Sequence, residues 1–476
     1  MEASGLTSLH EDRYFDPDPT IRRYARALYD ETRALPIVSP HGHVDPAILA
    51  SDDAFVDPTS LLITPDHYII RMLYSQGVSL ESLGVARIDG TSHAVERRPR
   101  KIWQRLVDHW HLFRGTPTRV WLEYELHEVF GIADSLNSES AKRIYDAISE
   151  RLQSPEFRPR ALFKRFNIEV LATTDAASDT LEHHETLSKV ELGGRVIPTF
   201  RPDELFRIAS PGWRAELARF ERAAGATIGN YAELLSAIAK RRAQFKAMGA
   251  TATDHAVVVP RTGRLDPSEA ERIFAKAFGG SANDDDQSEF EPHLLMDMAR
   301  MSLDDELVMQ LHVGAFRDHN DFVYRRFGPD RGGDIPVATE FTRNLRPLLN
   351  AYGNDPRFQL IVFTLDESTY ARELAPLAGH YPAMFLGAPW WFNDSIEGMT
   401  RFRHAATETA GIENTAGFAD DTRAFCSIPA RHDLARRVDA NYLGGLIARH
   451  VIDANDASEM AKALAYTLAK RAYRLS

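Results

Sequence analysis

The sequence predicts an α/β protein, a distorted (β/α)8 TIM-type barrel with a helical insertion after strand 1. Two observations lead to this prediction: short apolar runs alternate with helical stretches, and most of these runs end in polar side chains. Parallel strands that are buried on both faces read as continuous apolar runs, and strands that alternate with helices form βα units. In such barrels the functional residues stand just past the C-terminal ends of the strands. The polar endings fit that rule.

Seven apolar runs are expected to be strands, and an eighth, less regular run lies near Ala250–Val257. The seven are Pro36–Val38, Glu169–Ala172, Arg195–Pro198, Val308–Leu311, Gln359–Thr364, Ala383–Leu386 and Thr415–Ala419. The residues that follow them include HGH, TTD, TFRPD, HVGAFR, LDES, GAPWWFND and DDTR.

The spacing of the runs divides the chain into three expected parts. Residues 1–49 would hold an N-terminal helix and strand 1, residues 50–160 a helical insertion, and residues 161–476 the remainder of the barrel. In the insertion, Thr64-Pro65 predicts a helix start, with Thr64 as N-cap and the proline in the first helical position, and Gly77 predicts its end. The acidic stretch Gly279–Glu291 is expected to be a surface loop.

Composition narrows the classes of function. The formal net charge is −12, which argues against a nucleic-acid partner. Cys426 is the single cysteine, so no intrachain disulfide can form, and no apolar run approaches the roughly 18 residues of a membrane helix. The N-terminus MEASGLTSLHEDRYFDPDP lacks the pattern of a signal peptide. We therefore expect a cytoplasmic protein with no membrane partner. The sequence leaves the oligomeric state open, so the protein could be a homo-oligomer.

The first apolar run ends in His41-Gly42-His43. Side chains at positions i and i+2 of a strand point to the same side, so these two imidazoles can bind one metal ion. Imidazole suits zinc, iron, nickel or copper better than magnesium or calcium. The alternative is a pair of loop histidines that are hydrogen-bonded to backbone groups.

Two later runs end in residues that could complete this site. In a closed barrel strands one and eight are neighbours, which would bring Asp421 to the two histidines. Asp421 could instead cap a helix or pair with Arg423, and alternation would direct the side chain of Asp420 the other way. His312 follows a third run and is either functional or a packed core histidine.

These motifs resemble those of the amidohydrolase superfamily and, more closely, of the uronate (glucuronate) isomerase family. The segments that carry the resemblance occur in the family's order and are PHGHVDP, DHYIIRM, LATTDAASDTLEHH, IPTFRPD, QLHVGAFR, WWFND and DDTRAF. They extend over essentially the whole chain.

The resemblance implies an aldose–ketose isomerase that interconverts D-glucuronate and D-fructuronate, and D-galacturonate and D-tagaturonate, through a cis-enediol. It implies that His41, His43 and Asp421 bind a divalent metal, with His312 on or near it. The superfamily's usual carbamylated lysine and strand-six histidine have no counterpart here, and Leu365-Asp366 stands where that histidine would be. We therefore expect a mononuclear site. Its ligand types favour Zn²⁺, with manganese or iron as alternatives.

The remaining candidate residues would act on a hexuronic acid substrate. Arg201 is our candidate for gripping the substrate carboxylate, with an ion pair to Asp203 as the alternative. By resemblance His67 and Tyr68 contact the substrate, and Tyr68 could deliver or accept a proton. Arg423 would stabilise the enediolate or lower the pKa of Tyr68. Other candidates for substrate contact are Arg317, Trp390, Trp391 and His312.

Two other classes of function remain open from the sequence. One is a metal-dependent hydrolase or decarboxylase of the amidohydrolase superfamily, which would use the metal to activate water. The other is a sugar-acid binding protein without catalysis, which would not need His41, His43 and Asp421.

Overall fold

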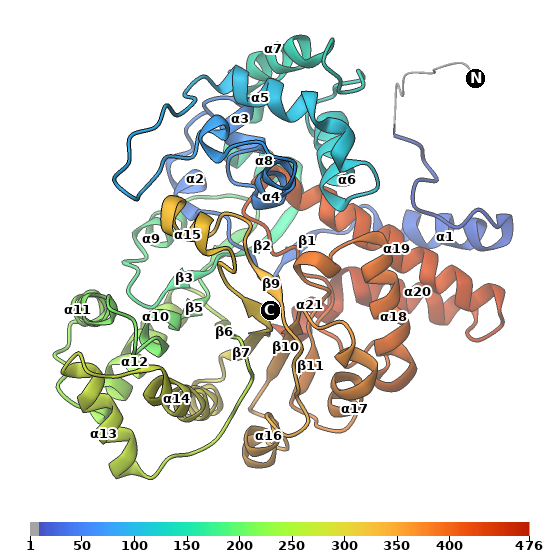
Figure 1. Cartoon of the computed structure of the whole chain (residues 1–476). Coiled ribbons are helices and arrows are strands. Elements are labelled where there is room, and N and C mark those ends of the chain that lie inside the picture. Colours follow the sequence, from blue (N-terminus) through green and yellow to red (C-terminus); the bar gives the residue numbers. More distant parts are fainter. Residues whose placement is uncertain (1–8, 476) are drawn as a thin grey trace.

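The chain folds around parallel sheets, and the computed structural model describes residues 9–475 (Figure 1). One sheet has the strand order β1-β2-β4 and the other β11-β10-β7-β6-β5-β3. A separate antiparallel hairpin joins β8 and β9. The strands are β1 (Ile37–Ser39), β2 (Ile168–Ala172), β3 (Asp175–Ala176), β4 (Arg195–Ile197), β5 (Phe200–Arg201), β6 (Ala252–Val257), β7 (Val308–Val313), β8 (Ala315–Phe316), β9 (Ile335–Pro336), β10 (Leu360–Thr364) and β11 (Met384–Leu386).

The two parallel sheets are joined by the chain itself, which runs from β2 into β3 and from β4 into β5. Within the larger sheet, Asp175 N of β3 donates to Thr199 O, next to β5, at 3.0 Å. The expected strand Thr415–Ala419 forms a single parallel bridge, from Thr415 to Leu386. Farther along the chain, Thr422 O accepts a hydrogen bond from His43 N at 2.9 Å. The residues after 415–419 therefore lie beside the turn that follows β1.

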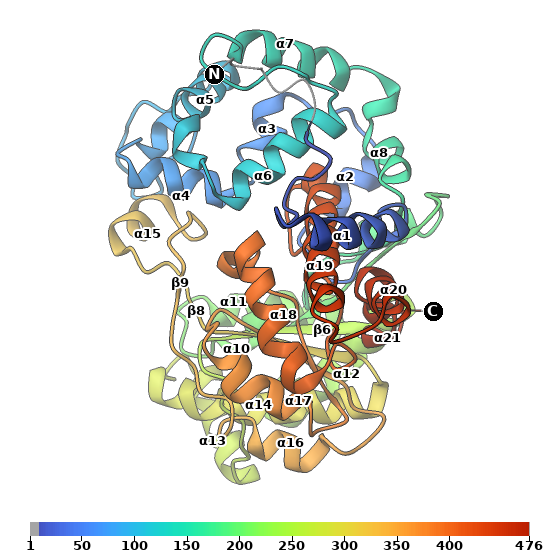
Figure 2. The same cartoon turned by 90° about the vertical axis from the view of Figure 1, so that its right-hand side faces the viewer.

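Between β1 and β2 the regular elements of the described chain are helical. In both views they gather on one side of the sheets (Figures 1 and 2). They include α2 (Pro46–Ser51), α3 (Pro58–Leu62), α4 (His67–Ser75), α5 (Pro99–Asp108), α6 (Pro117–Tyr124), α7 (Ala141–Leu152) and α8 (Pro159–Arg165).

The start of α4 corrects one expectation. Asp66, not Thr64, is its N-cap, and its carboxylate accepts hydrogen bonds from the N–H groups of Tyr68 at 2.7 Å and Ile69 at 3.3 Å. A carboxylate satisfies the free amides of a helix start and also suits its positive dipole end. His67 and Tyr68 still occupy the first turn, and Gly77 follows the helix end with a φ of 85°.

The remaining helices surround the sheets. They are α1 (Pro19–Thr32), α9 (Glu182–Leu187), α10 (Asp203–Phe206), α11 (Trp213–Ala224), α12 (Tyr231–Ala247), α13 (Pro267–Phe278), α14 (Asp284–Asp305), α15 (Asp321–Phe327), α16 (Arg346–Tyr352), α17 (Ala375–Ala378), α18 (Ile396–Ala410), α19 (Ile428–Ala448), α20 (Ala454–Lys462) and α21 (Leu468–Ala472). The expectation of a loop over Gly279–Glu291 is wrong from residue 284 onward. There Asn283 caps α14 through a reciprocal capping box with Asp286.

The apolar core fills the space between the sheets and these helices. Strands β7 and β10 are buried throughout, as expected for strands that are covered on both faces. Among the described residues, none of the helices combines the length and apolar character needed to cross a membrane. The first eight residues of the N-terminal segment that was considered as a signal peptide lie outside the described residues.

Candidate active site

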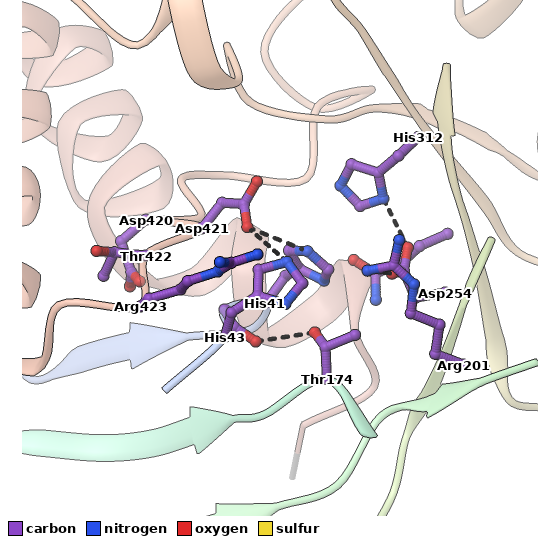
Figure 3. A network of polar contacts seen from close by, with 12 residues as sticks. His41, His43, Thr174, Arg201, Asp254, His312, Asp420, Asp421, Thr422 and Arg423 are labelled. Carbon is purple, nitrogen blue, oxygen red and sulfur yellow. Dashed lines mark hydrogen bonds and ion pairs between the residues drawn. The ribbon is translucent and has the colours of Figure 1, made fainter. Parts of the chain in front are cut away.

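His41, His43 and Asp421 meet at one point, as Figure 3 shows. Asp421 Oδ1 lies 3.5 Å from His41 Nε2 and 3.1 Å from His43 Nε2. The ligand-type atoms of the three residues all lie within 4.8 Å of one another. The two imidazoles come from the turn between β1 and α2, and the carboxylate comes from the segment after β11. The expected meeting of residues from the two ends of the chain is therefore present.

Backbone contacts hold these side chains in place. Thr174, from the TTD motif after β2, donates its hydroxyl to Gly42 O at 2.8 Å. Asp421 N donates to His41 O at 3.2 Å, and Asp421 has a φ of 41°, a left-handed conformation that is uncommon for a residue with a side chain. Such strain persists where the surroundings over-determine it, and it clusters at functional sites.

The neighbouring Asp420 points the other way, as alternation predicts. Its carboxylate is 1% exposed, and Oδ2 lies 3.1 Å from His432 Nε2 on α19. Arg431 Nη1 donates to the carbonyl of Asp420 at 3.2 Å. These contacts fix the backbone next to Asp421 and leave Asp421 as the carboxylate that faces the histidines.

His312 faces the same point and is oriented by Asp254. Its Nδ1 lies 2.6 Å from Asp254 Oδ1, and its ring centroid lies 4.5 Å from that of His41. Its other nitrogen, Nε2, is buried without a hydrogen-bond partner among the described residues. A carboxylate on one ring nitrogen fixes the tautomer and leaves the other nitrogen as a ligand.

Asp254 was missed by the sequence reasoning, although a signal for it existed. It stands in the middle of the buried strand β6, where it is 1% exposed. An acidic residue inside a buried strand is costly unless it is paired, which makes it a marker of function.

The donor set fits a divalent metal ion. Tetrahedral coordination at zinc–nitrogen distances of about 2.0–2.1 Å places donors roughly 3.3 Å apart, and the distances from Asp421 to the two histidines bracket this value. Burial would raise the pKa of Asp421, but the close imidazoles of His41 and His43 hold that pKa well below its usual range. The carboxylate is thus ionised, as a metal ligand must be.

A cavity of about 790 Å³ opens beside these ligands. All of the site residues that the sequence predicted line it, which are His41, His43, His67, Tyr68, Arg201, His312, Arg317, Trp390, Trp391, Asp421 and Arg423. Its volume falls within the range of small-molecule sites, about 300–1,000 Å³.

The arginines of the cavity are mostly paired with carboxylates. Arg201 Nε lies 2.7 Å from Asp203 Oδ2, and its Nη1 lies 3.3 Å from Asp254 Oδ2, so the ion pair that was considered as an alternative for Arg201 is present. The other pairs are Arg317 with Asp334, Arg423 with Asp330, and Arg431 with Asp394. Asp330, Asp334, Asp394 and Arg431 were not predicted from the sequence, because their ion-pair partners lie in other segments of the chain.

Aromatic rings form one wall of the cavity around Tyr68. The ring centroid of Trp391 lies 5.5 Å from that of His67, and that of Trp390 lies 4.9 Å from that of His312. Burial raises the pKa of Tyr68 well above its usual value, and the cation that acts against this is Arg431. Tyr68 is therefore a protonated phenol at neutral pH, able to donate a hydrogen bond.

Comparison with known proteins identifies the family. The family model described as glucuronate isomerase matches residues 19–473. The uronate isomerase of Nostoc punctiforme is 54% identical over 468 residues, which cover 98% of both chains. The crystal structure of glucuronate isomerase from Caulobacter crescentus superposes with a TM-score of 0.96 at 47% identity, covering 99% of this chain and 98% of that one.

More distant structures share the fold. The uronate isomerase structure from Thermotoga maritima has a TM-score of 0.91 at 29% identity, covering 98% of this chain and 99% of that one. A putative metal-dependent hydrolase from Lactobacillus casei has a TM-score of 0.55 at 15% identity over 94% of this chain and 97% of that one, a likeness of fold alone. The chain belongs to the glucuronate isomerase family and is an enzyme with uronate isomerase activity.

Proposed function

We propose that the enzyme interconverts D-glucuronate with D-fructuronate, and D-galacturonate with D-tagaturonate. The observation that carries the proposal is the meeting of His41, His43 and Asp421 beside a cavity that arginine and tryptophan side chains line. Isomerisation moves a proton between C2 and C1, which requires a polarised oxygen, a base and a group that holds the carboxylate. The cavity offers a candidate for each.

The metal site would be mononuclear, with His41, His43 and Asp421 as ligands and His312 beside them. The mixed imidazole and carboxylate donors favour Zn²⁺. When bound, such an ion supplies Lewis acidity next to the oxygen atoms at C1 and C2 of the open-chain sugar. Support comes from the spacing of the donors and from the free Nε2 of His312.

The protein's own groups would move the proton. Asp421 would remove the proton at C2 and the phenol of Tyr68 would deliver one at C1, while the hydroxyl proton moves from O2 to O1 through the cis-enediol. His67, in the first turn of α4, would hold a substrate oxygen, and Arg423 would stabilise the negative charge of the enediolate. The protonated state of Tyr68 at neutral pH supports its role as the donor.

Arg201 and Arg317 would hold the substrate carboxylate, and Trp390 and Trp391 would form the wall against the sugar carbons. Arg201 keeps its two aspartate partners in this arrangement. A guanidinium has five N–H donors, so it can bind an additional carboxylate while it remains paired.

The fold proposed for this activity is a closed (β/α)8 barrel with residues 50–160 as an insertion after strand 1. Support for closure comes from the hydrogen bonds of residues 421–422 with the turn after β1 on one side, and from the Thr415–Leu386 bridge on the other. Residues 1–49 and 161–476 would then form one barrel.

The test is an assay of purified, metal-replete protein with D-glucuronate and D-galacturonate that follows ketose formation. We expect turnover of at least one hexuronate, with deuterium from solvent entering at C1 or C2. Absence of turnover with both sugars would refute the proposal. Incorporation of oxygen from labelled water into the product would instead favour the hydrolase alternative.

A further inference from the structure

One loop, absent from the sequence predictions, forms part of the cavity wall. Residues 328–334, Gly-Pro-Asp-Arg-Gly-Gly-Asp, follow α15, and we call them the acidic loop. The loop packs on the first turn of α4 through Gly332, whose φ is 77°. A Cβ atom at this glycine would lie 2.6 Å from Arg71 Cβ and 2.9 Å from His67 O. Such close backbone approach requires glycine, so the loop is built to sit against α4.

The acidic loop places Asp330 between two candidate catalytic side chains. Its carboxylate pairs with the guanidinium of Arg423, and its Oδ1 lies 3.6 Å from His67 Nδ1. Arg423 comes from the segment after β11 and His67 from the first turn of α4. Asp330 therefore connects three parts of the chain that are far apart in sequence.

The backbone of Asp330 is held in an uncommon conformation. Its φ is 66°, and its N–H donates to Asp318 Oδ1 at 2.9 Å. Residues with a side chain adopt this left-handed region at a cost, which the surrounding structure must offset. Burial would raise the pKa of Asp330, but the hydrogen bond from Arg423 lowers it, so the residue is a carboxylate at neutral pH.

We propose that Asp330 is a positioning residue that holds the guanidinium of Arg423 and the imidazole of His67 in their working geometry at the cavity wall. This inference rests on the proposed function, in which both groups contact the substrate. The side chain of Arg423 is 42% exposed, so without a partner it would sample several rotamers. A carboxylate that is fixed by a strained loop removes that freedom before the substrate binds.

The alternative is an ordinary surface ion pair, which contributes little. Three observations argue against it: Asp330 lines the cavity, it faces two candidate catalytic groups, and its backbone is strained. The chain also offers a matched ordinary pair. Asp321 on α15 pairs with Arg325 at 3.0 Å, and these side chains are 78% and 77% exposed.

The first experiment compares Asp330→Asn with Asp321→Asn, both in metal-loaded full-length enzyme. Asparagine keeps the shape and one acceptor oxygen and removes the charge. We expect kcat of the Asp330 variant to fall at least about 10-fold, since small misplacements of catalytic groups are costly. The Asp321 variant should stay within about 2-fold of wild type. Equal activity of wild type and the Asp330 variant would overturn the proposal.

A double-mutant cycle with Arg423→Ala separates positioning from general destabilisation. If Asp330 acts mainly through Arg423, Asp330→Asn should lower kcat by less than about 3-fold in the Arg423→Ala background. An undiminished effect in that background would contradict the part of the proposal that concerns Arg423. A loss of activity that accompanies a lowered melting temperature would also contradict the proposal.

Binding of D-glucarate, a sugar acid without an aldehyde, gives a readout that does not need turnover. Calorimetric titration should show at least about 3-fold weaker binding to the Asp330 variant than to wild type, and unchanged affinity would count against positioning. Wild-type enzyme that turns over neither hexuronate would refute the proposed function itself. An active wild type with an unaffected Asp330 variant would refute only the positioning role.

Discussion

His43 Nε2 lies 3.1 Å from Asp421 Oδ1, although one residue follows the first strand and the other follows the last. The hydrogen bonds that join residues 421–422 to the turn after β1 bring them together. Asp421 is thereby the carboxylate that faces both His41 and His43.

Replacing Asp421 with asparagine is expected to lower kcat at least about 100-fold, the range for a positioned proton-transfer group. The carboxamide has the same shape but is a poor base and a weaker metal ligand. Steady-state assays combined with metal analysis of the same sample check this. The neighbouring Asp420 cannot serve as the control position, because its carboxylate is buried against His432. Unchanged turnover in Asp421→Asn would show that Asp421 is neither the base nor an essential metal ligand.

Replacing Asp254 with asparagine is expected to weaken metal binding about 10- to 100-fold, the usual effect of removing a carboxylate that orients a metal-site histidine. Competition with a coloured chelator measures this. Asp203→Asn is the matched control, because Asp203 also pairs with Arg201, whereas it is Asp254 that contacts His312. Equal metal affinity in the two variants would show that orientation of His312 by Asp254 does not contribute to metal binding.

Removal of metal with a chelator is expected to abolish most of the turnover and to lower the melting temperature, since an ion that binds only the folded state stabilises it. Zn²⁺ should restore both. Activity that survives complete removal, verified by elemental analysis, would contradict a metal-dependent mechanism. Restoration by manganese or iron but not by zinc would revise the identity of the metal.

Replacing Gly332 with alanine is expected to displace the acidic loop and reduce kcat/KM at least about 10-fold, because the new Cβ would collide with α4. Gly280→Ala is the control. Gly280 has a similar φ of 73°, but a Cβ there meets nothing within 4 Å. It should therefore lose only about 1 kcal/mol of stability and keep its activity. Similar kinetics in both variants would mean that the fit of the loop on α4 is unimportant.

Glu125 should make the folding stability depend on pH. Burial, with the charge of Asp66, raises its pKa to about 8 from an ordinary value of 4.5. Between these values the folded state holds a proton that the unfolded state has lost. Stability therefore falls as pH rises through this window. Glu125→Gln should remove this loss. Relative to wild type, the free energy of unfolding of the variant should rise by about 4 kcal/mol between pH 5 and pH 9.

Urea unfolding at the two pH values measures the effect of Glu125. Glu128→Gln, an exposed neighbour on the same turn, is the control and should keep the pH dependence of wild type. A parallel pH dependence in wild type and Glu125→Gln would contradict the assignment of this effect to Glu125.

The sequence predicted most of the buried parallel strands and the HGH–Asp421 meeting, because both depend on patterns that are local or fixed by topology, but the expected strand Thr415–Ala419 forms only an isolated bridge. Apolar runs mark buried parallel strands. Asp420 and Asp421 lie outside a regular strand, and Asp421 has a left-handed φ of 41°. Local capping was less reliable. Thr64-Pro65 has the residues of a helix start, but Asp66 competes successfully because its carboxylate accepts two amide hydrogen bonds.

Residues that act through distant partners were beyond the sequence. Asp330 becomes meaningful only because the acidic loop folds onto α4 and beside Arg423. Nothing near it in the chain indicates those neighbours. Arg431 is similar: it lies within the long helix α19, and its importance follows from contacts with Asp394 and with the carbonyl of Asp420.

The distance in sequence between the HGH turn and Asp421 has a consequence during protein synthesis. Ribosomes add roughly 5–20 residues per second, so roughly 20–80 s separate the synthesis of His43 from that of Asp421. For all of that time a nascent chain has His41 and His43 but lacks the carboxylate of Asp421. With the proposed ligands, the complete coordination shell could form only when translation is almost finished.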